Sequence, residues 1–305
     1  MKTITIYKLI FLSFLFTFIS CQKDAVVTNE QGKQDIAEKI IENLPVTVDN
    51  NTLVFTSEEN FQECINMIGD YNTSQLDLFE KIIGFSSYRT QVNDTICDDD
   101  FFLTLLNPNA EIIIGDYLFK VDFTKEKTFA TPIFIDENKK SESHLVFSWD
   151  DDIFEILKNG NQNLHKKSAK SFCPSNKEKY KYWVIYPDIL TAREKIKAKV
   201  CYQRFGIYNS IIMKFKAEEF NIDSPLVNAS YHTVGTNFYE NKKKYKEFSR
   251  QNYTTFVGQG NEIHHRPYQS GRRLKRYFVS VKFSWNYTDS DGNHHDEKTL
   301  TISCP

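Results

Sequence analysis

A basic and aromatic segment in the last quarter of the chain offers the clearest chemistry in the sequence. The stretch RPYQSGRRLKR carries guanidinium, ammonium and phenol groups, and NKKKYKE lies upstream of it. Guanidinium groups form paired hydrogen bonds with sulfate, phosphate or carboxylate, and tyrosine rings stack on sugars or bases. The predicted polyanion-binding residues are Arg266, Tyr268, Arg272, Arg273, Lys275, Arg276, Lys243 and Tyr245. The alternative is a set of solvated strand edges, where lysine discourages aggregation.

Two aspartate triplets, Asp98–Asp100 and Asp150–Asp152, each precede an apolar helical turn. Paired carboxylates bind cations or transfer protons, and two of them at a suitable separation hydrolyse glycosidic bonds. A glycan-processing hydrolase is therefore the alternative function. We expect instead that the triplets cap helices and complement the positive ends of the helix dipoles. The sequence holds no GxSxG, HExxH or P-loop motif, so no catalytic residue and no cofactor are predicted.

Two histidine pairs, His264-His265 and His294-His295, are the candidate metal ligands. Adjacent side chains of an extended strand point to opposite faces, so only one histidine of each pair could reach a shared ion. A site would also need a nearby carboxylate. Both pairs lie close to glycine turns, and we expect exposed loops and no metal site.

The N-terminus contains an uncharged run, LIFLSFLFTFI, that follows Lys2 and Lys8. Its 11 residues suit the core of a secretory signal peptide and fall short of the ~18–20 apolar residues that a spanning helix needs. The small residue Ser20 precedes Cys21, as a signal peptidase requires. We expect residues 1–20 to be removed, which leaves 285 residues. The alternative is an ordinary secretory signal followed by a chance cysteine.

The run that ends at Ser20-Cys21 resembles the signal of bacterial lipoproteins, in which the cysteine is diacylated and becomes the new N-terminus. The following CQKDAV is similar to the signal that exports Bacteroidetes lipoproteins to the outer face of the outer membrane, with Lys23 and Asp24 as its charged residues. The resemblance implies a lipid such as palmitate on Cys21, outer-membrane attachment through that lipid, and display towards the extracellular side.

Two further stretches, FEKIIGFSSYRTQ and LLNPNAEIIIGDYLFKVDF, resemble segments of uncharacterised Bacteroidetes surface lipoproteins. This likeness covers residues 50–150 and carries no catalytic residue. It implies a location and a fold type, and it implies no activity.

Charge is unevenly distributed in a chain whose net charge is only −2. Residues 1–160 hold 13 Lys and Arg against 27 Asp and Glu, whereas residues 161–305 hold 25 against 13. The asymmetry indicates two modules or one basic face, and we favour halves that pack with complementary charge or solvate their lysines. The predicted organisation is a signal peptide (1–20), a flexible tether (21–35), an acidic α+β domain (36–160), a linker (161–180) and a basic β-rich domain (181–305).

Five cysteines remain after Cys21, and an odd number in an oxidising compartment leaves at least one unpaired. We consider the pairs Cys64–Cys97 and Cys201–Cys304. Free buried thiols throughout, with Cys173 among them, are an equal alternative.

Hydrophobic periodicity predicts an α+β fold, with helices and a hairpin in the N-terminal half and mainly antiparallel strands in the C-terminal half. Helices are expected over residues 35–44, from Thr56 to Ile68 and from Ser74 to Ile83. Gly115-Asp116 predicts a two-residue type II′ hairpin. The apolar positions that alternate along the later strands are Ile196, Ala198, Val200, Tyr202, Ile211, Met213, Phe215, Tyr277, Val279, Val281, Phe283, Trp285, Tyr287, Leu300, Ile302 and Cys304.

These patterns predict a lipid-anchored surface lipoprotein that acts as a non-catalytic binding or structural module. The candidate partner, besides the membrane, is an acidic glycan or another polyanion. No specific nucleic acid is predicted, because a basic surface alone describes association and not recognition chemistry.

Overall fold

The structure of the protein is a computed structural model. The structure describes residues 30–91, 99–133, 144–159, 173, 179–184, 195–218, 227–239, 244–256, 262–289 and 292–304. The predicted signal peptide, Cys21, Lys23 and Asp24 lie outside these ranges. The chain divides into two units, Met1–Lys39 and Ile40–Pro305, and helix α2 (Glu30–Glu42) crosses their boundary. Since α2 begins at Glu30, it starts inside the predicted tether.

Short helices occupy the N-terminal half of the second unit. They are α3 (Glu58–Ile68), α4 (Thr73–Ile83), the 3-10 helix η1 (Tyr88–Gln91), α5 (Asp100–Thr104) and α6 (Ile153–Lys158). Phe61, Ile65 and Ile68 form the buried apolar face of α3, and the helix begins one residue later than expected, because Ser57 rather than Thr56 is its N-cap. The Ser57 hydroxyl accepts a hydrogen bond from the amide of Asn60, which satisfies one of the open N–H groups of the first turn.

Helix α4 ends where its sequence predicts. Asn72 and Gln75 form a reciprocal capping box at the start, in which each side chain accepts a hydrogen bond from the other residue's amide. Gly84 closes the helix in the left-handed region, with φ of +69°, a conformation that glycine adopts without strain.

The first sheet has six strands in the order β1 (Thr47–Asp49), β2 (Thr52–Phe55), β3 (Glu111–Ile114), β4 (Tyr117–Asp122), β5 (Lys127–Pro132) and β6 (Leu145–Ser148). Neighbouring strands are antiparallel except β2 and β3, which are parallel and are joined through the helical segment. The predicted hairpin is confirmed: Ile114 pairs with Tyr117, and Gly115 has φ of +58°, as the first loop residue of a type II′ turn requires.

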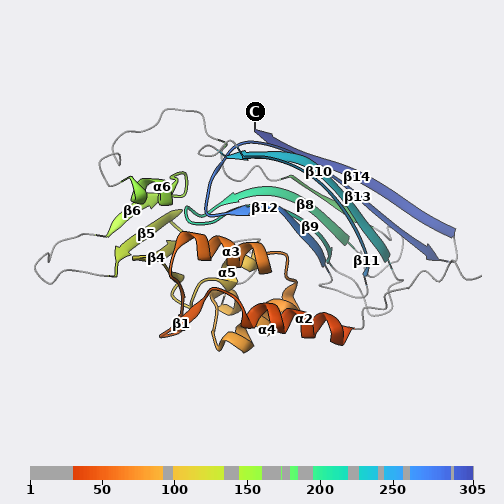
Figure 1. The fold of residues 1–305 in the computed structure, drawn as a ribbon. Coiled ribbons are helices and arrows are strands. Elements are labelled where there is room, and N and C mark those ends of the chain that lie inside the picture. The colour runs from red at the N-terminus through yellow and green to blue at the C-terminus, as the bar shows by residue number, and fades with distance from the viewer. Residues whose placement is uncertain are drawn as a thin grey trace, which may run out of the picture. The chain divides into compact units, whose positions relative to one another are not determined.

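Two four-stranded antiparallel sheets make up the C-terminal half (Figure 1). The first, named here the β8 sheet, has the order β12 (Glu262–Ser270), β9 (Asn209–Glu218), β8 (Lys195–Arg204) and β7 (Lys179–Val184). The second, the β13 sheet, has the order β11 (Lys244–Phe256), β10 (Val227–Tyr239), β13 (Leu274–Asp289) and β14 (Gly292–Cys304). The predicted final hairpin is formed by β13 and β14, in which Asp289 pairs with Gly292 and Tyr277 with Cys304.

A common hydrophobic core joins these two sheets. The predicted alternating positions of β8, β9, β13 and β14 belong to one cluster of buried side chains, apart from Tyr287, whose side chain lies outside the described part. Aromatic contacts bridge the sheets, with ring centroids 5.1 Å apart for Phe215 and Phe283 and also for Tyr202 and Tyr277. The α+β class, with helices in the N-terminal half and mainly antiparallel strands in the C-terminal half, is therefore confirmed.

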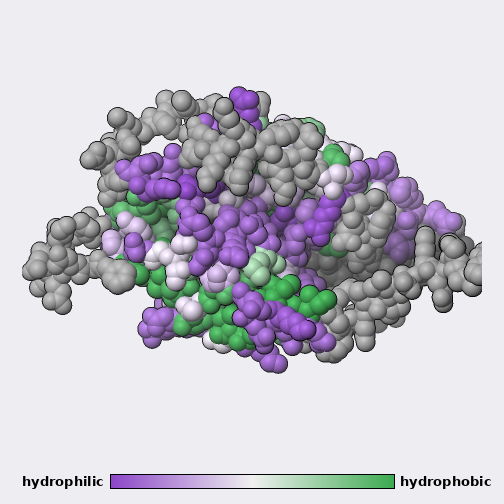
Figure 2. Space-filling model, viewed as in Figure 1, coloured by the Kyte–Doolittle hydropathy of each residue, from purple (hydrophilic) through white to green (hydrophobic). Residues whose placement is uncertain are grey.

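The surface of the helical part is mixed in character. Figure 2 shows hydrophilic side chains over the centre of the face in view and hydrophobic ones gathered below, around α4. Within the described residues, no helix has both the length and the hydropathy needed to cross a membrane.

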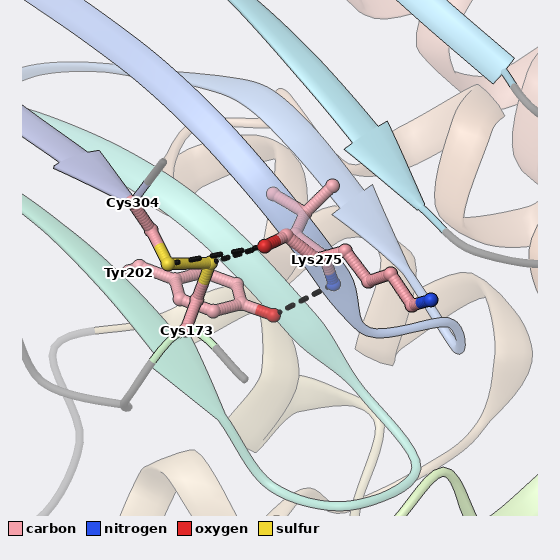
Figure 3. Close-up of a disulfide and its surroundings, with 5 residues drawn as sticks. Cys173, Tyr202, Lys275 and Cys304 are labelled. Carbon is pink, nitrogen blue, oxygen red and sulfur yellow. Dashed lines mark hydrogen bonds between the residues drawn. A yellow bond between two sulfur atoms is a disulfide. The ribbon is translucent and has the colours of Figure 1, made fainter. Parts of the chain in front are cut away.

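A disulfide joins Cys173 to Cys304 (Figure 3), so the predicted pair Cys201–Cys304 is wrong. Strand alternation gives the reason: Val200 and Tyr202 face the core that also holds Cys304, and Cys201 between them therefore faces the other side of the β8 sheet. The two Cα atoms of the observed pair are 5.5 Å apart, and the sulfur atoms lie 2.8 and 3.8 Å from the carbonyl oxygen of Lys275.

The predicted pair Cys64–Cys97 is also wrong, because Cys64 is a free thiol in α3. It is fully buried, and burial raises the pKa of this thiol to about 12, so it stays protonated and behaves as a small apolar side chain. Cys97 lies outside the described residues.

Removal of the disulfide should destabilise the β-rich part. The bond closes a loop with a sequence separation of 131, and the double variant Cys173→Ser/Cys304→Ser should lose about 2–5 kcal/mol of unfolding free energy in urea titrations. Dithiothreitol should lower the stability of the wild type to that of the variant and leave the variant unchanged. Recovery of a Cys201–Cys304 peptide from a non-reducing digest would contradict the assignment.

Candidate functional site

The predicted basic segment spans the end of β12 and the start of β13. A bulge in β12 determines the direction of the side chain of Arg266, the first arginine of the segment. His265 pairs with Met213 and Tyr268 with Ile211, so three steps along β12 match two steps along β9. The extra residue lies at Arg266-Pro267. Proline has no N–H to donate to the ladder and is tolerated at such irregularities. A bulge redirects the side chains beside it, and Arg266 is buried against the helical part of the unit.

Arg266 forms a buried ion pair with Asp99, the residue that precedes α5. The Nε and Nη2 atoms of Arg266 each lie 2.9 Å from Oδ1 of Asp99, and the two side chains are 1% and 0% exposed. Nη1 donates to the carbonyl oxygen of Gly69 at 2.7 Å, and the guanidinium carbon lies 5.5 Å from the centroid of the Phe101 ring. The charge of this predicted ligand-binding residue is thus balanced inside the protein.

The second oxygen of Asp99 is also saturated. Oδ2 accepts hydrogen bonds from the hydroxyl of Ser210 at 2.6 Å and from that of Tyr208 at 3.1 Å. Burial by itself would raise the pKa of Asp99, but the charge of Arg266 and the hydrogen bond from Ser210 lower it below its ordinary value. Burial, together with the neighbouring carboxylate, raises the pKa of Tyr208 well above its ordinary value, so the phenol remains a donor.

A second cluster surrounds Asp70, which follows the C-cap of α3. Its Oδ2 accepts a hydrogen bond from Nη1 of Arg250 at 2.6 Å, and its Oδ1 accepts one from the backbone amide of Arg266 at 3.1 Å. His265 Nδ1 lies 3.4 Å from the same carboxylate, and the imidazole stacks on Tyr231. Burial would raise the pKa of Asp70, but its contacts with His265 and the two arginines lower it. Burial lowers the pKa of His265, which therefore favours the neutral ring.

The turn between β12 and β13 places Arg272 against two carboxylates. Its Nε and Nη2 atoms lie 2.7 and 2.8 Å from the two oxygens of Glu58, a paired geometry, and Nη1 lies 3.3 Å from Asp152. Burial raises the pKa of both Glu58 and Asp152, and the charge of Arg272 acts in the opposite direction. The neighbouring Arg273 donates from Nη1 to the backbone carbonyl of Asp150.

Tyr268, Lys275 and Arg276, three further predicted ligand-binding residues, do not share one surface. Tyr268 is buried and donates its hydroxyl hydrogen to the carbonyl oxygen of Arg272. Lys275 is half-buried beside the disulfide, and Arg276 is exposed on the β13 sheet, two residues before Phe278, which is 46% exposed. Tyr245 lies in β11 and pairs with Phe238, and Lys243 is outside the described residues. Binding of a polyanion by this set stays a prediction.

The distribution of these contacts explains the charge asymmetry of the sequence. Carboxylates of the N-terminal half meet basic side chains of the C-terminal half in the pairs Arg266–Asp99, Arg250–Asp70, Arg272–Glu58, Arg272–Asp152, Arg204–Asp150 and Lys214–Asp100. The expectation that the halves pack with complementary charge is therefore confirmed for these residues. Sequence pattern could not identify the partners, because each pair joins residues more than 50 positions apart.

The aspartate triplets have mixed roles. Asp152 caps α6 as predicted, since its side chain accepts a hydrogen bond from the amide of Glu155. Asp99 occupies the N-cap position of α5 but makes no capping hydrogen bond there, because both oxygens are used by Arg266, Ser210 and Tyr208. The capping expectation is therefore wrong for Asp99. Asp98 lies outside the described residues.

The expectation of exposed loops for the histidine pairs is wrong, because His264-His265 lie in β12, with His265 buried, and His294-His295 lie in β14. Nε2 of His264 lies 3.0 Å from the carbonyl oxygen of Tyr71, and His265 belongs to the Asp70 cluster. Over the ranges that the structure describes, no group of three or more His, Cys, Asp or Glu side chains could hold a metal ion.

Comparison with known proteins adds little. No protein-family model and no curated protein match this chain. Among solved structures, a DUF4848 family protein from Bacteroides thetaiotaomicron is similar at 9% identity, over 84% of this chain and 100% of that chain, with a TM-score of 0.20. A TM-score this low carries no argument about fold or function.

Loss of Arg266 should leave the Asp99 carboxylate buried without its counter-charge. We expect Arg266→Met to lower the unfolding free energy by about 3–5 kcal/mol in urea titrations, and Asp99→Asn combined with Arg266→Met to recover part of that loss. Lys282 forms an exposed pair with Glu297 at 2.6 Å, and Lys282→Met should cost below about 1 kcal/mol. Equal losses for the two methionine variants would show that the buried pair has no special role.

Proposed function

We propose that this protein is an exported lipoprotein, anchored by lipid on Cys21, that acts as a non-catalytic binding or structural module. The observation that carries the proposal is the disulfide between Cys173 and Cys304. Disulfides form and persist in oxidising compartments outside the cytosol, so this bond supports a chain that has been exported. The signal-like N-terminus supports the same conclusion independently.

The lipid anchor rests on the order of residues at the N-terminus. An apolar core of 11 residues ends at a small residue followed by Cys21, and Lys23-Asp24 come directly behind it. Diacylation at one cysteine supplies two buried chains, and each buried methylene contributes ~0.8 kcal/mol, so two chains hold a protein at a membrane more firmly than one does. We therefore propose attachment to the outer membrane with the folded unit on the extracellular side.

The proposed ligand class is an acidic glycan or a related polyanion. Residues 161–305 hold 25 Lys and Arg against 13 Asp and Glu, so this half of the chain carries a surplus of positive charge. The exposed Arg276 beside Phe278 supports the proposal, because cation and aromatic side chains together suit charged sugars.

Replacement of Cys21 should separate the protein from the membrane. In a Bacteroidetes host, Cys21→Ser should abolish incorporation of an alkyne palmitate analogue and move the chain from the membrane fraction to the soluble fraction. Ser20→Ala keeps a small residue before the cysteine and should leave labelling intact. Unchanged membrane fractionation of Cys21→Ser would falsify the anchor.

The polyanion preference predicts salt-sensitive binding on a glycan array. The soluble Cys21→Ser chain should bind sulfated or carboxylated glycans at about 50 mM salt and lose most of that binding at about 200 mM, because ionic contacts release counterions. Neutral glycans of the same backbone are the control. Equal signals on neutral and acidic glycans, or signals that salt does not change, would argue against this ligand class.

A further inference from the structure

Arg204, at the end of β8, is a buried cation whose hydrogen-bonding groups are only partly used. Its side chain is 2% exposed, and its Nη2 atom is paired with the carboxylate of Asp150. The Nε and Nη1 atoms are buried, and in the described part of the chain no acceptor lies within hydrogen-bonding distance of either one. A buried donor without an acceptor is unfavourable, and more so when it carries charge.

A second guanidinium lies beside the first. Arg273, in the turn between β12 and β13, is buried and donates from Nη1 to the backbone carbonyl of Asp150, so both arginines meet the same residue. Burial lowers the pKa of Arg273, the positive charge of Arg204 lowers it further, and the carboxylates of Asp152 and Asp150 act in the opposite direction. The two guanidinium groups repel each other, and an anion bound between them would reduce that repulsion.

Two carboxylates supply negative charge near Arg273: Asp152, which is paired with Arg272, and Asp150, which is largely exposed. The side chain of Asp150 is 66% exposed, so its carboxylate remains largely hydrated while it pairs with a buried arginine. Arg89 offers a comparison within the same chain. It pairs with Asp77, which is 63% exposed, but its Nε and Nη2 atoms also donate to Glu80 at 3.2 and 2.9 Å. Arg89 is therefore satisfied by a second carboxylate, and Arg204 has no such second partner in the described residues.

Two phenols complete the surroundings with further donors. The hydroxyl of Tyr277 is buried and has no hydrogen-bond partner in the described ranges. Burial raises the pKa of Tyr277 to about 12, with Arg204 acting in the opposite direction, so the group remains a donor at neutral pH. The hydroxyl of Tyr202 accepts a hydrogen bond from the amide of Leu274, as Figure 3 shows, and still has its own hydrogen to donate.

We propose that Arg204 and Arg273 form a binding site for an oxyanion, a sulfate or phosphate group, whose oxygens replace the carboxylate of Asp150. A tetrahedral oxyanion suits this place better than a carboxylate does, because it has more oxygens to accept from Arg204, Arg273 and Tyr277. In this proposal the site binds the charged group of the ligand. The inference rests on the proposed function of the protein as a binding module. The lipid anchor plays no part in it.

The test is saturable stabilisation by inorganic sulfate and inorganic phosphate, measured as thermal unfolding of the soluble Cys21→Ser chain. Each anion is titrated against sodium chloride at equal ionic strength. A specific site produces a shift that saturates with concentration, whereas the general stabilising effect of sulfate rises without saturation and is shared by all variants. Saturation with only one of the two anions would assign the site to that ester class.

Three variants in the same background make the result specific to this site. Asp150→Asn removes the competing carboxylate and should tighten anion binding roughly two- to fivefold. Arg273→Gln should weaken it at least about tenfold, because a charge-assisted hydrogen bond is lost. Asp77→Asn removes an equally exposed aspartate from the satisfied Arg89 and should leave the anion affinity unchanged.

The proposal fails if neither anion gives a saturable shift, or if Asp150→Asn and Arg273→Gln match the Asp77→Asn control. Such a failure is distinguishable from failure of the proposed function, because acidic-glycan binding on the array would then persist in the Arg273→Gln variant. Loss of both the anion shift and the array signal in Arg273→Gln alone would place the charged group of the glycan at this site.

Discussion

A fully buried guanidinium and a fully buried carboxylate, Arg266 and Asp99, hold the bulge of β12 against the start of α5. Neither group could remain charged at that depth without the other, because the cost of removing an ion from water is recovered only by a close partner and by further hydrogen bonds. Ser210, Tyr208 and the carbonyl of Gly69 supply those hydrogen bonds. The position of the helical segment on the β8 sheet therefore depends on this network.

The other ion pairs extend the same arrangement along the contact between the halves. Asp70 lies beside Arg250 and His265, and Arg272 lies between Glu58 and Asp152. Apart from the buried His265, these groups are partly exposed, so the loss of one partner costs less than in the buried pair. Their effect is to define the alignment of the two halves. The acidic residues of one half of the sequence and the basic residues of the other therefore serve, in these pairs, to hold the two halves together.

This use of charge changes which basic residues are candidates for ligand binding. Arg266 and Arg272 are engaged by carboxylates, whereas Arg204 and Arg273 meet at Asp150, a residue whose carboxylate is mostly hydrated. The sequence pattern did not identify Arg204 as a candidate ligand-binding residue, because a single arginine at the end of a strand has no distinguishing neighbours in the sequence. Its burial and its unused donors are visible only once β8, β13 and the segment before α6 are brought together.

Local patterns in the sequence were sufficient for the fold class, the ends of α4, the Gly115-Asp116 hairpin and the alternating core of β8, β9, β13 and β14, because each depends on residues that are neighbours along the chain. The predicted N-terminal signal likewise rests on a local pattern, and it stays a prediction. Local patterns could not predict the long-range pairings. These are the disulfide of Cys173 with Cys304, the bulge that turns Arg266 inward, and the partners of Asp99 and Asp70. The sequence shows that these charged groups and thiols are present. Which of them come within bonding distance depends on how the sheets and helices pack, because the partners are far apart along the chain.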